Sequence, residues 1–236
     1  GLVGFAIGTE TWGSIVSLST RCGVSGLRPT FGRVSRYGAM ALSWSMDKIG
    51  PIARSVEDLA LIFQAIIGPD GKDRTVFDLP FSYDGQSDLK KIRIGYYKKS
   101  FEEARRHKDK YLAVLNTLSS MGLDLEEIEL PEIDPEMISF ILNVEAAAAF
   151  DELTRTNQDE LMVRQGRDAW PNIFRQARFV PAVEYIQANR LRAMLIEQLA
   201  SKLKEIDVYL DTPSGPSLLL TNLTGQPTVV VPCGFD

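Results

Sequence analysis

The sequence predicts a single α/β domain, residues 1–236, in which a mixed β-sheet is covered by helices on both faces. Short apolar runs typical of strands alternate with stretches whose apolar residues recur at helical spacing. The sequence contains no internal repeat, low-complexity tract or linker that would divide it. With 236 residues, 44% of them hydrophobic, the chain can bury one sizeable core.

The predicted strands are short runs of apolar and β-branched residues bounded by glycine, proline or polar turns. The first strand, over 2–7, is expected to be buried and to lead into a Gly-rich turn over 8–13. Further strands are expected near Ile49 and over 123–130. Five strands are expected to pair in one sheet with helices on both faces: 2–7, 24–28, 92–97, 206–211 and 227–232.

The predicted helices are amphipathic stretches with recognisable ends. Gly23 is expected to end the first one, because glycine adopts the left-handed conformation common after a helix C-terminus. Ser55 is a clear N-cap, since Asp58 follows three residues later. The stretch 160–181 is polar and aromatic and receives no assignment. The predicted helices are 14–22, one beginning at Ser55, 101–122, 134 to about 160, and 182–204.

Composition and charge exclude several classes of protein. The net charge of −5 provides no field for nucleic acid or an anionic membrane. Cys22 and Cys233 are too far apart in sequence to form a disulfide framework, which favours a reduced compartment. No apolar run reaches the roughly 18 residues of a membrane span. The sequence therefore predicts a cytoplasmic protein that contacts neither nucleic acid nor membrane directly.

Four catalytic or binding motifs are disfavoured. Gly8 and Gly13 frame a loop between strand and helix, but a Walker phosphate loop requires lysine where Ser14 stands. His107 is the only histidine and lies in a charged helix, which argues against a Ser-His-Asp triad and a zinc site. Ser45 and Lys48 have S-x-x-K spacing without the companion segments of penicillin-binding enzymes, so a turn is the better interpretation. We expect no cofactor and no metal.

Ser14 itself has the right sequence context for a nucleophile. Backbone amides that converge ahead of a hydroxyl meet the requirement of an oxyanion hole, and glycine lets the backbone approach closely. A helix that begins at Ser14 adds its positive end. A simple N-cap serine explains the pattern equally well. In both cases Ser14 should lie at the N-terminal end of a helix, with the preceding amides pointing into a cleft.

A longer pattern resembles the amidase signature family. The segment GTETWGSIVSLSTRCGVSGLRPTFGRVSRYG, over 8–38, is similar to the family form G-[ST]-[DE]-T-x-G-S-I-R-x-P-A-x-x-C-G-V-x-G-L-K-P-T-x-G-R-V-S. SWSMDKIGPIARSVEDLALI continues the match, which resumes at YIQANRLR and TNLTGQPTVVVPCGF. Dense matches cover roughly 3–68 and 184–235.

The resemblance implies hydrolysis of amide bonds by a Ser-Ser-Lys triad without any cofactor. The nucleophile carries over onto Ser14, and the oxyanion donors onto the backbone amides of Thr11, Trp12, Gly13 and Ser14. The family's lysine and cis-serine lie upstream of the nucleophile segment. We therefore expect this chain to be an internal fragment, inactive by itself, that also stops before the family's last strand and helix.

Two positions depart from the family pattern. Trp12 replaces a glycine, as a subset with GTETxGSI allows, so it must accept the loop's backbone angles or narrow the site. Val16 replaces an arginine that binds a substrate carboxylate in some members, so a free-acid substrate loses support. Lys48 does not occupy the position of the family's lysine.

The sequence leaves three functional hypotheses open. The first is an amidase acting on a small-molecule amide. The second is the glutaminase A subunit of a tRNA-dependent amidotransferase, which passes ammonia to partner subunits. The third is a fragment without a complete site. Truncation is expected to expose an apolar sheet edge at 2–7, and the sequence allows a homo-oligomer.

Overall fold

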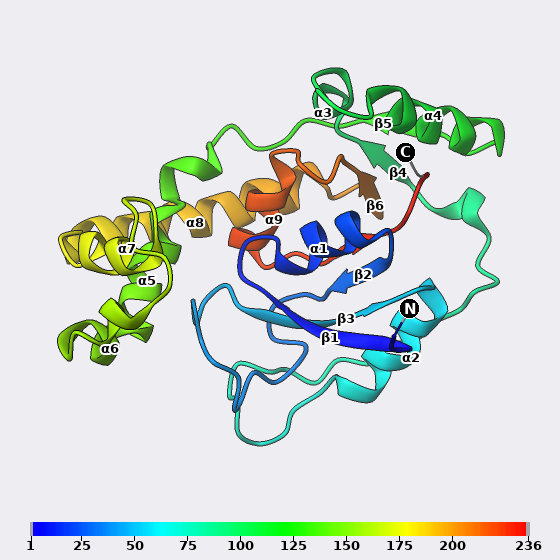
Figure 1. The fold of residues 1–236 in the computed structure, drawn as a ribbon. Coiled ribbons are helices and arrows are strands. Elements are labelled where there is room, and N and C mark those ends of the chain that lie inside the picture. The colour runs from blue at the N-terminus through cyan, green and yellow to red at the C-terminus, as the bar shows by residue number, and fades with distance from the viewer. Residues whose placement is uncertain (1, 235–236) are drawn as a thin grey trace.

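The computed structural model describes residues 2–234 and confirms the mixed α/β class (Figure 1). The elements are, in chain order, β1 (Phe5–Glu10), α1 (Ser14–Cys22), β2 (Ser25–Arg28), β3 (Lys48–Ala53), α2 (Val56–Ile66), η1 (Leu89–Lys91), β4 (Ile94–Tyr96), α3 (Lys98–Glu102), α4 (Lys108–Ser120), β5 (Leu125–Glu127), η2 (Pro135–Ile138), α5 (Phe140–Ala149), α6 (Asp151–Arg155), η3 (Gln158–Leu161), α7 (Trp170–Ala177), α8 (Ala182–Lys202), β6 (Val208–Leu210), α9 (Ser217–Thr224) and β7 (Thr228–Val230).

The first sheet is antiparallel and has the strand order β1-β3-β2-β7. Its β1–β3 register runs from Phe5 opposite Ala53 to Glu10 opposite Lys48. α1 packs on one face and α2 on the other, as Figure 1 shows. A Cβ added to Gly26 of β2 would overlap the Ser19 hydroxyl of α1, so only glycine permits this close approach.

The second sheet is parallel, with the order β5-β4-β6. The prediction that five strands form one sheet is therefore wrong. β1, β2 and β7 belong to the first sheet, whereas β4 and β6 belong to the second. Apolar runs indicate that a segment is extended, but the pairing partner depends on which backbones meet in three dimensions.

The N-terminal strand is an exposed edge and not a buried strand, which corrects a second prediction. Among the described strands, β3 is the partner of β1 in the ladder. The side chains of Phe5 and Ile7 are 53% and 47% exposed. Unpaired backbone groups beside exposed apolar side chains can pair with a second chain. Self-association at this edge stays a prediction.

Helix ends were predicted more accurately than helix continuity. The Ser55 side chain accepts a hydrogen bond from the Asp58 amide at 3.1 Å, and Gly23 has a φ of 61°, as expected. The predicted helix over 101–122 is divided into α3 and α4. His107, with a φ of 57°, precedes α4 in the left-handed conformation, which cannot continue a helix. The predicted helix over 134–160 is likewise divided among η2, α5, α6 and η3.

The main core cluster lies between helices. Leucines of α8 and α9 pack against isoleucines of η2 and α5. This packing fixes α9 against the long helix α8, and α5 in turn packs against α7. Across residues 2–234, none of the helices combines the length and the apolar character that crossing a bilayer requires.

Candidate active site

Ser14 is the first residue of α1, as predicted, and its exposed side chain lines a cavity. β1 ends at Glu10, so a three-residue turn separates strand from helix. Gly13 caps the helix with a φ of 128°, a conformation that side chains disfavour. An added Cβ on Gly13 would also lie 3.1 Å from a methyl group of Leu218. Glycine is therefore required directly before the serine.

Trp12 occupies the turn without backbone strain. Of the described non-glycine residues, only His107 and Asn157 have positive φ, so the departure from the family's glycine requires no unusual angle at Trp12. The Trp12 side chain is 37% exposed and does not line the Ser14 cavity. The bulky residue therefore neither strains the loop nor narrows this cavity.

The backbone amides around Ser14 fall into two groups. The amides of Ile15 and Val16 donate to one carboxylate oxygen of Glu10, at 2.8 and 2.9 Å. The amides over 11–14 lie beyond the end of β1 and take no part in sheet pairing. Within residues 2–234 they donate to no other protein group. The predicted position of Ser14 at the start of a helix is confirmed, whereas the direction of the amides over 11–14 into the cavity stays a prediction.

Glu10 anchors the start of α1 through a buried ion pair. Its other oxygen accepts a hydrogen bond from the Arg28 guanidinium at 2.7 Å and from the Asn222 amide at 2.8 Å. The side chains of Glu10 and Arg28 are both 0% exposed. Arg28 also donates to the Gln226 carbonyl, at 2.9 Å. One carboxylate thus joins β1, α1, β2 and α9.

A second carboxylate ties the turn before Ser14 to the loop before β3. The Thr11 hydroxyl donates to Asp47 at 2.5 Å. The other oxygen of Asp47 accepts the amides of Leu42 and Ser43, at 2.8 and 3.0 Å. The turn before Ser14 and the loop over 42–47 are therefore held as one unit.

Glu145 of α5 fixes the same loop from the opposite side. It accepts hydrogen bonds from Ser43, Ser45 and Tyr185, at 2.6 to 3.0 Å. Burial raises the pKa of Glu145, but these hydrogen bonds lower it more, so its pKa lies below the ordinary value. Arg192 of α8 also donates to the Ser45 hydroxyl at 2.7 Å. The loop is thereby attached to the helical core.

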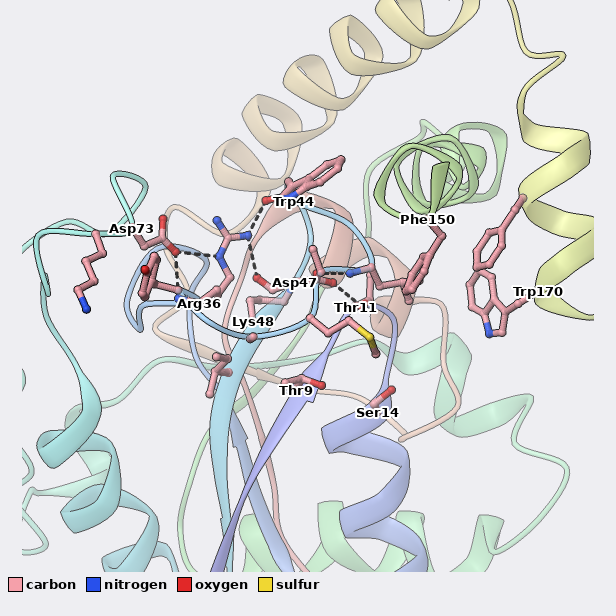
Figure 2. A pocket seen from close by; sticks show the side chains of 18 of the residues that line it. Thr9, Thr11, Ser14, Arg36, Trp44, Asp47, Lys48, Asp73, Phe150 and Trp170 are labelled. Carbon is pink, nitrogen blue, oxygen red and sulfur yellow. Dashed lines mark hydrogen bonds and ion pairs between the residues drawn. The ribbon is translucent and has the colours of Figure 1, made fainter. Parts of the chain in front are cut away.

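The cavity that Ser14 lines has a volume of about 720 Å³, within the range of about 300–1,000 Å³ that holds drug-sized ligands. Figure 2 shows Thr9 and Ser14 along its lower part and Thr11 in the middle, beside Asp47. Arg36, Lys72, Asp73 and Arg74 gather at one end with Tyr37 and Trp44 beside them, whereas the stacked rings of Phe150, Trp170 and Phe174 form the other end. The charged lining residues are Arg36, Asp47, Lys48, Lys72, Asp73 and Arg74. The large apolar lining residues are Tyr37, Met40, Leu42, Trp44, Ile49, Phe150, Met162, Trp170 and Phe174.

Lys48 lines the cavity, but its amine is directed to carbonyl groups. The side chain is buried, and Nζ donates to the carbonyls of Met46 and Asn222, the second at 3.4 Å. Burial lowers the pKa of Lys48 to about 7, helped by the Arg28 charge and opposed by that of Glu10. Within the described residues, Lys48 makes no hydrogen bond to Ser14. It is a desolvated amine that the structure does not place as the serine's base.

The lowered pKa of Lys48 predicts a pH-dependent stability. Between its folded pKa of about 7 and the unfolded value near 10.4, the unfolded state binds more protons, so stability increases with pH. Lys48→Met should remove a slope of up to about 1.4 kcal/mol per pH unit. Urea unfolding at pH 7, 8, 9 and 10 measures this slope. Exposed Lys204, changed to Met, is the matched control, and equal slopes in both variants would contradict the prediction.

His107 lies away from Ser14. It is exposed, as expected, and lines a second cavity of about 600 Å³ together with Ser17, Arg21 and Tyr111. The two cysteines are exposed and unpaired. Over residues 2–234, no group of three or more His, Cys, Asp or Glu side chains could hold a metal ion.

Two parts of the site were missed in the sequence. Glu10 was not singled out, although the acid within GTETWGSI lies beside the nucleophile segment. Trp170 and Phe174 were also missed, because α7 falls in the unassigned stretch 160–181, whose aromatic content was their signal. Phe150 was missed because it lies at the end of α5, within the predicted helix over 134–160.

A serine at the N-terminal end of a helix, on the wall of a deep cavity in an α/β fold, is typical of enzymes that form acyl-serine intermediates. Comparison with known proteins is consistent with this class. Residues 1–233 match the family model described as Amidase, and the chain belongs to this family.

Curated relatives include the A subunits of Glutamyl-tRNA(Gln) amidotransferases. The chain is 31% identical over 285 residues to the one from Prochlorococcus marinus (strain MIT 9211), an alignment that covers 100% of this chain and 58% of the relative. It is 41% identical over 136 residues to the one from Staphylococcus epidermidis, covering 56% of this chain and 28% of that relative. The chain therefore spans little more than half the length of the curated relatives it matches.

Solved structures of the family share the fold. The native peptide amidase from Stenotrophomonas maltophilia matches with a TM-score of 0.78 and 26% identity, over 99% of this chain and 56% of that one. The Glutamyl-tRNA(Gln) amidotransferase A subunit from Thermotoga maritima matches with a TM-score of 0.75 over 99% of this chain and 56% of that one. At 23% identity, this second likeness shows the fold alone.

Proposed function

We propose that the protein is an amide-bond hydrolase in which Ser14 is the nucleophile. The observation that carries this proposal is the position of Ser14 at the start of α1, exposed to the cavity, behind a turn whose amides are not used in the sheet. Membership of the Amidase family supports the reaction class.

The reaction follows from the chemistry of these groups. The Ser14 Oγ forms a bond to the amide carbon while its proton passes to a base, and the carbonyl electron pair moves onto oxygen. The backbone amides of Thr11, Trp12, Gly13 and Ser14 stabilise that oxyanion. One such donor is typically worth about 10²–10³ in kcat. The C–N bond then breaks, the amine leaves with a proton, and water hydrolyses the acyl-serine ester.

Glu10 defines which amides are available to the oxyanion. Because it accepts the amides of Ile15 and Val16, its negative charge is directed to the first turn of α1 and is balanced by Arg28. The amides of residues 11–14 precede this turn and remain for the substrate.

The base is proposed from the resemblance. The family's triad is Ser-Ser-Lys, with its lysine and second serine upstream of the nucleophile segment. Among the described residues, Lys48 is bonded to two carbonyls and His107 lines another cavity, so neither serves Ser14. We place the enzyme in the cytoplasm, since two exposed, unpaired cysteines fit a reducing compartment.

A second candidate function is the glutaminase component of a tRNA-dependent amidotransferase. It is favoured by the curated relatives, which are A subunits of such enzymes. In that case the protein would co-purify with partner subunits, and glutamine would be its ammonia donor.

The assay compares two preparations on a panel of simple amides and glutamine. The intact protein from the whole reading frame is expected to release amine or ammonia, because its nucleophile and base are then both present. The 236-residue chain alone is expected to release none, because no described residue acts as base for Ser14. Turnover by the short chain would show that its base lies within these residues. An intact protein inactive on every amide would contradict the proposed function.

A further inference from the structure

The apolar end of the Ser14 cavity is an ordered aromatic wall contributed by two helices. Phe150 follows α5, whereas Trp170 and Phe174 lie on α7. The Phe150 and Phe174 rings stack with centroids 5.0 Å apart and an interplanar angle of 15°. The Trp170 and Phe174 rings stack at 5.6 Å and 27°. Phe174 is 2% exposed, so it supports the two half-buried rings from behind.

Ser14 and this wall lie on the same side of the cavity. In Figure 2, Ser14, Phe150 and Trp170 occupy one side of the cavity, and Arg36 and Asp73 occupy the other. Stacked rings held by helices offer flat apolar surface at little entropic cost. Such surface favours an aromatic or bulky apolar ligand group.

Arg36 and Lys72 at the charged end already have partners within the protein. Arg36 pairs with Asp73 at 3.2 Å and also donates to the carbonyl of Trp44. Burial raises the pKa of Asp73, but hydrogen bonds from Thr75 and Arg36 lower it far more, so it stays ionised. The Lys72 ammonium lies 4.6 Å from the centre of the Tyr37 ring. Because of these contacts, Arg36 and Lys72 are less available to pair with a substrate carboxylate.

The first turn of α1 offers no cation either. Val16 is 2% exposed, and its amide is occupied by Glu10. A free amino acid such as glutamine therefore finds no cation on the first turn of α1 for its α-carboxylate. The exposed cations of the cavity lining that a carboxylate would pair with are Lys72 and Arg74, on the loop that also carries Asp73.

We propose that the substrate is an amide with an aromatic or bulky apolar acyl group, which lies against Phe150 and Trp170 while its carbonyl lies over Ser14. This inference rests on the proposed function and specifies its substrate class. It disfavours small aliphatic amides and free glutamine.

The kinetic test uses the intact protein with 3-phenylpropionamide, propionamide, N-benzylacetamide and glutamine. We expect kcat/KM for 3-phenylpropionamide to exceed that for propionamide by about 10–100-fold, since pocket contacts of this size are worth that much. Phe150→Ala and Trp170→Ala should each lower this ratio about tenfold, and Trp170→Phe should retain most of it. Phe179→Ala is the matched control, because Phe179 follows α7 but is 86% exposed.

A binding test needs no turnover. All three tryptophans, Trp12, Trp44 and Trp170, lie in the turn before Ser14 or line the cavity, so their fluorescence reports on its occupancy. Titration of the intact protein carrying Ser14→Ala, which prevents turnover, with 3-phenylpropionamide should change the emission, and glutamine at equal concentration should not. Phe150→Ala should weaken the response about tenfold if it remains folded by circular dichroism.

The outcomes separate this inference from the proposed function. Amide hydrolysis without a preference for the aromatic acyl group, or with a preference for glutamine or N-benzylacetamide, would overturn the inference and leave the hydrolase standing. Selective binding in the fluorescence titration, with no hydrolysis of any amide by the intact protein, would overturn the proposed function instead. Unchanged ratios in folded Phe150→Ala and Trp170→Ala would show that the aromatic wall does not contact the substrate.

Discussion

Ser14→Ala in the intact protein is expected to lower kcat for amide hydrolysis about a million-fold, as removal of a nucleophile from a serine-protease catalytic unit does. The fold should survive, because the Ser14 side chain is exposed and α1 is anchored by Glu10 through the amides of Ile15 and Val16. Slow residual turnover is expected, since the oxyanion amides belong to the backbone. The measurements are kcat and covalent labelling by a fluorophosphonate, with the labelled peptide identified by mass spectrometry.

Ser17→Ala is the matched control for this experiment. Ser17 lies one turn further along the same helix, half-buried, and lines the second cavity and not that of Ser14. It should keep near-parental kcat and full labelling. If purified Ser14→Ala also keeps near-parental activity, the nucleophile is another residue.

The second large effect is on stability. Replacing Glu10 with alanine is expected to lower the free energy of unfolding by about 3–5 kcal/mol, the usual cost of leaving one partner of a buried ion pair uncompensated. Arg28 is 0% exposed and would lose its carboxylate, and the amides of Ile15 and Val16 would lose their acceptor. Urea unfolding at pH 7 measures the change.

Two further variants separate charge from hydrogen bonding. Glu10→Gln combined with Arg28→Met removes both charges and keeps an acceptor for the amides, so it should be more stable than either single variant. Glu103→Gln, in the exposed pair with Lys99, should leave stability nearly unchanged because solvent screens that pair. A Glu10→Ala variant no less stable than Glu103→Gln would show that the buried pair is dispensable.

Local features of the site were predictable because their causes lie within a few residues. The start of α1 follows from the conformational freedom of Gly13, and its end follows from Gly23. The start of α2 follows from the Ser55 hydroxyl, which accepts the Asp58 amide. The length of the longer helices was less predictable, because the left-handed conformation of His107 has no strong signal in the sequence.

Long-range features of the site were not predictable in this way. Glu10 and Asn222 are separated by 212 positions, yet the Asn222 amide donates to Glu10 at 2.8 Å. The aromatic wall likewise requires α5 and α7 to pack against each other before Phe150 and Phe174 stack. No periodicity within either segment contains that information.

The sequence by itself determined the α/β class, the helix ends near Ser14 and Ser55, and the position of Ser14 at the start of a helix. These depend on backbone propensities and capping, which act over a single turn. Only the tertiary structure decided that β4 and β6 form a separate parallel sheet, that β1 is an exposed edge, and that Lys48 is directed to carbonyls. These outcomes depend on contacts between segments that are distant in sequence, because such contacts decide which strands pair and which side chains are buried.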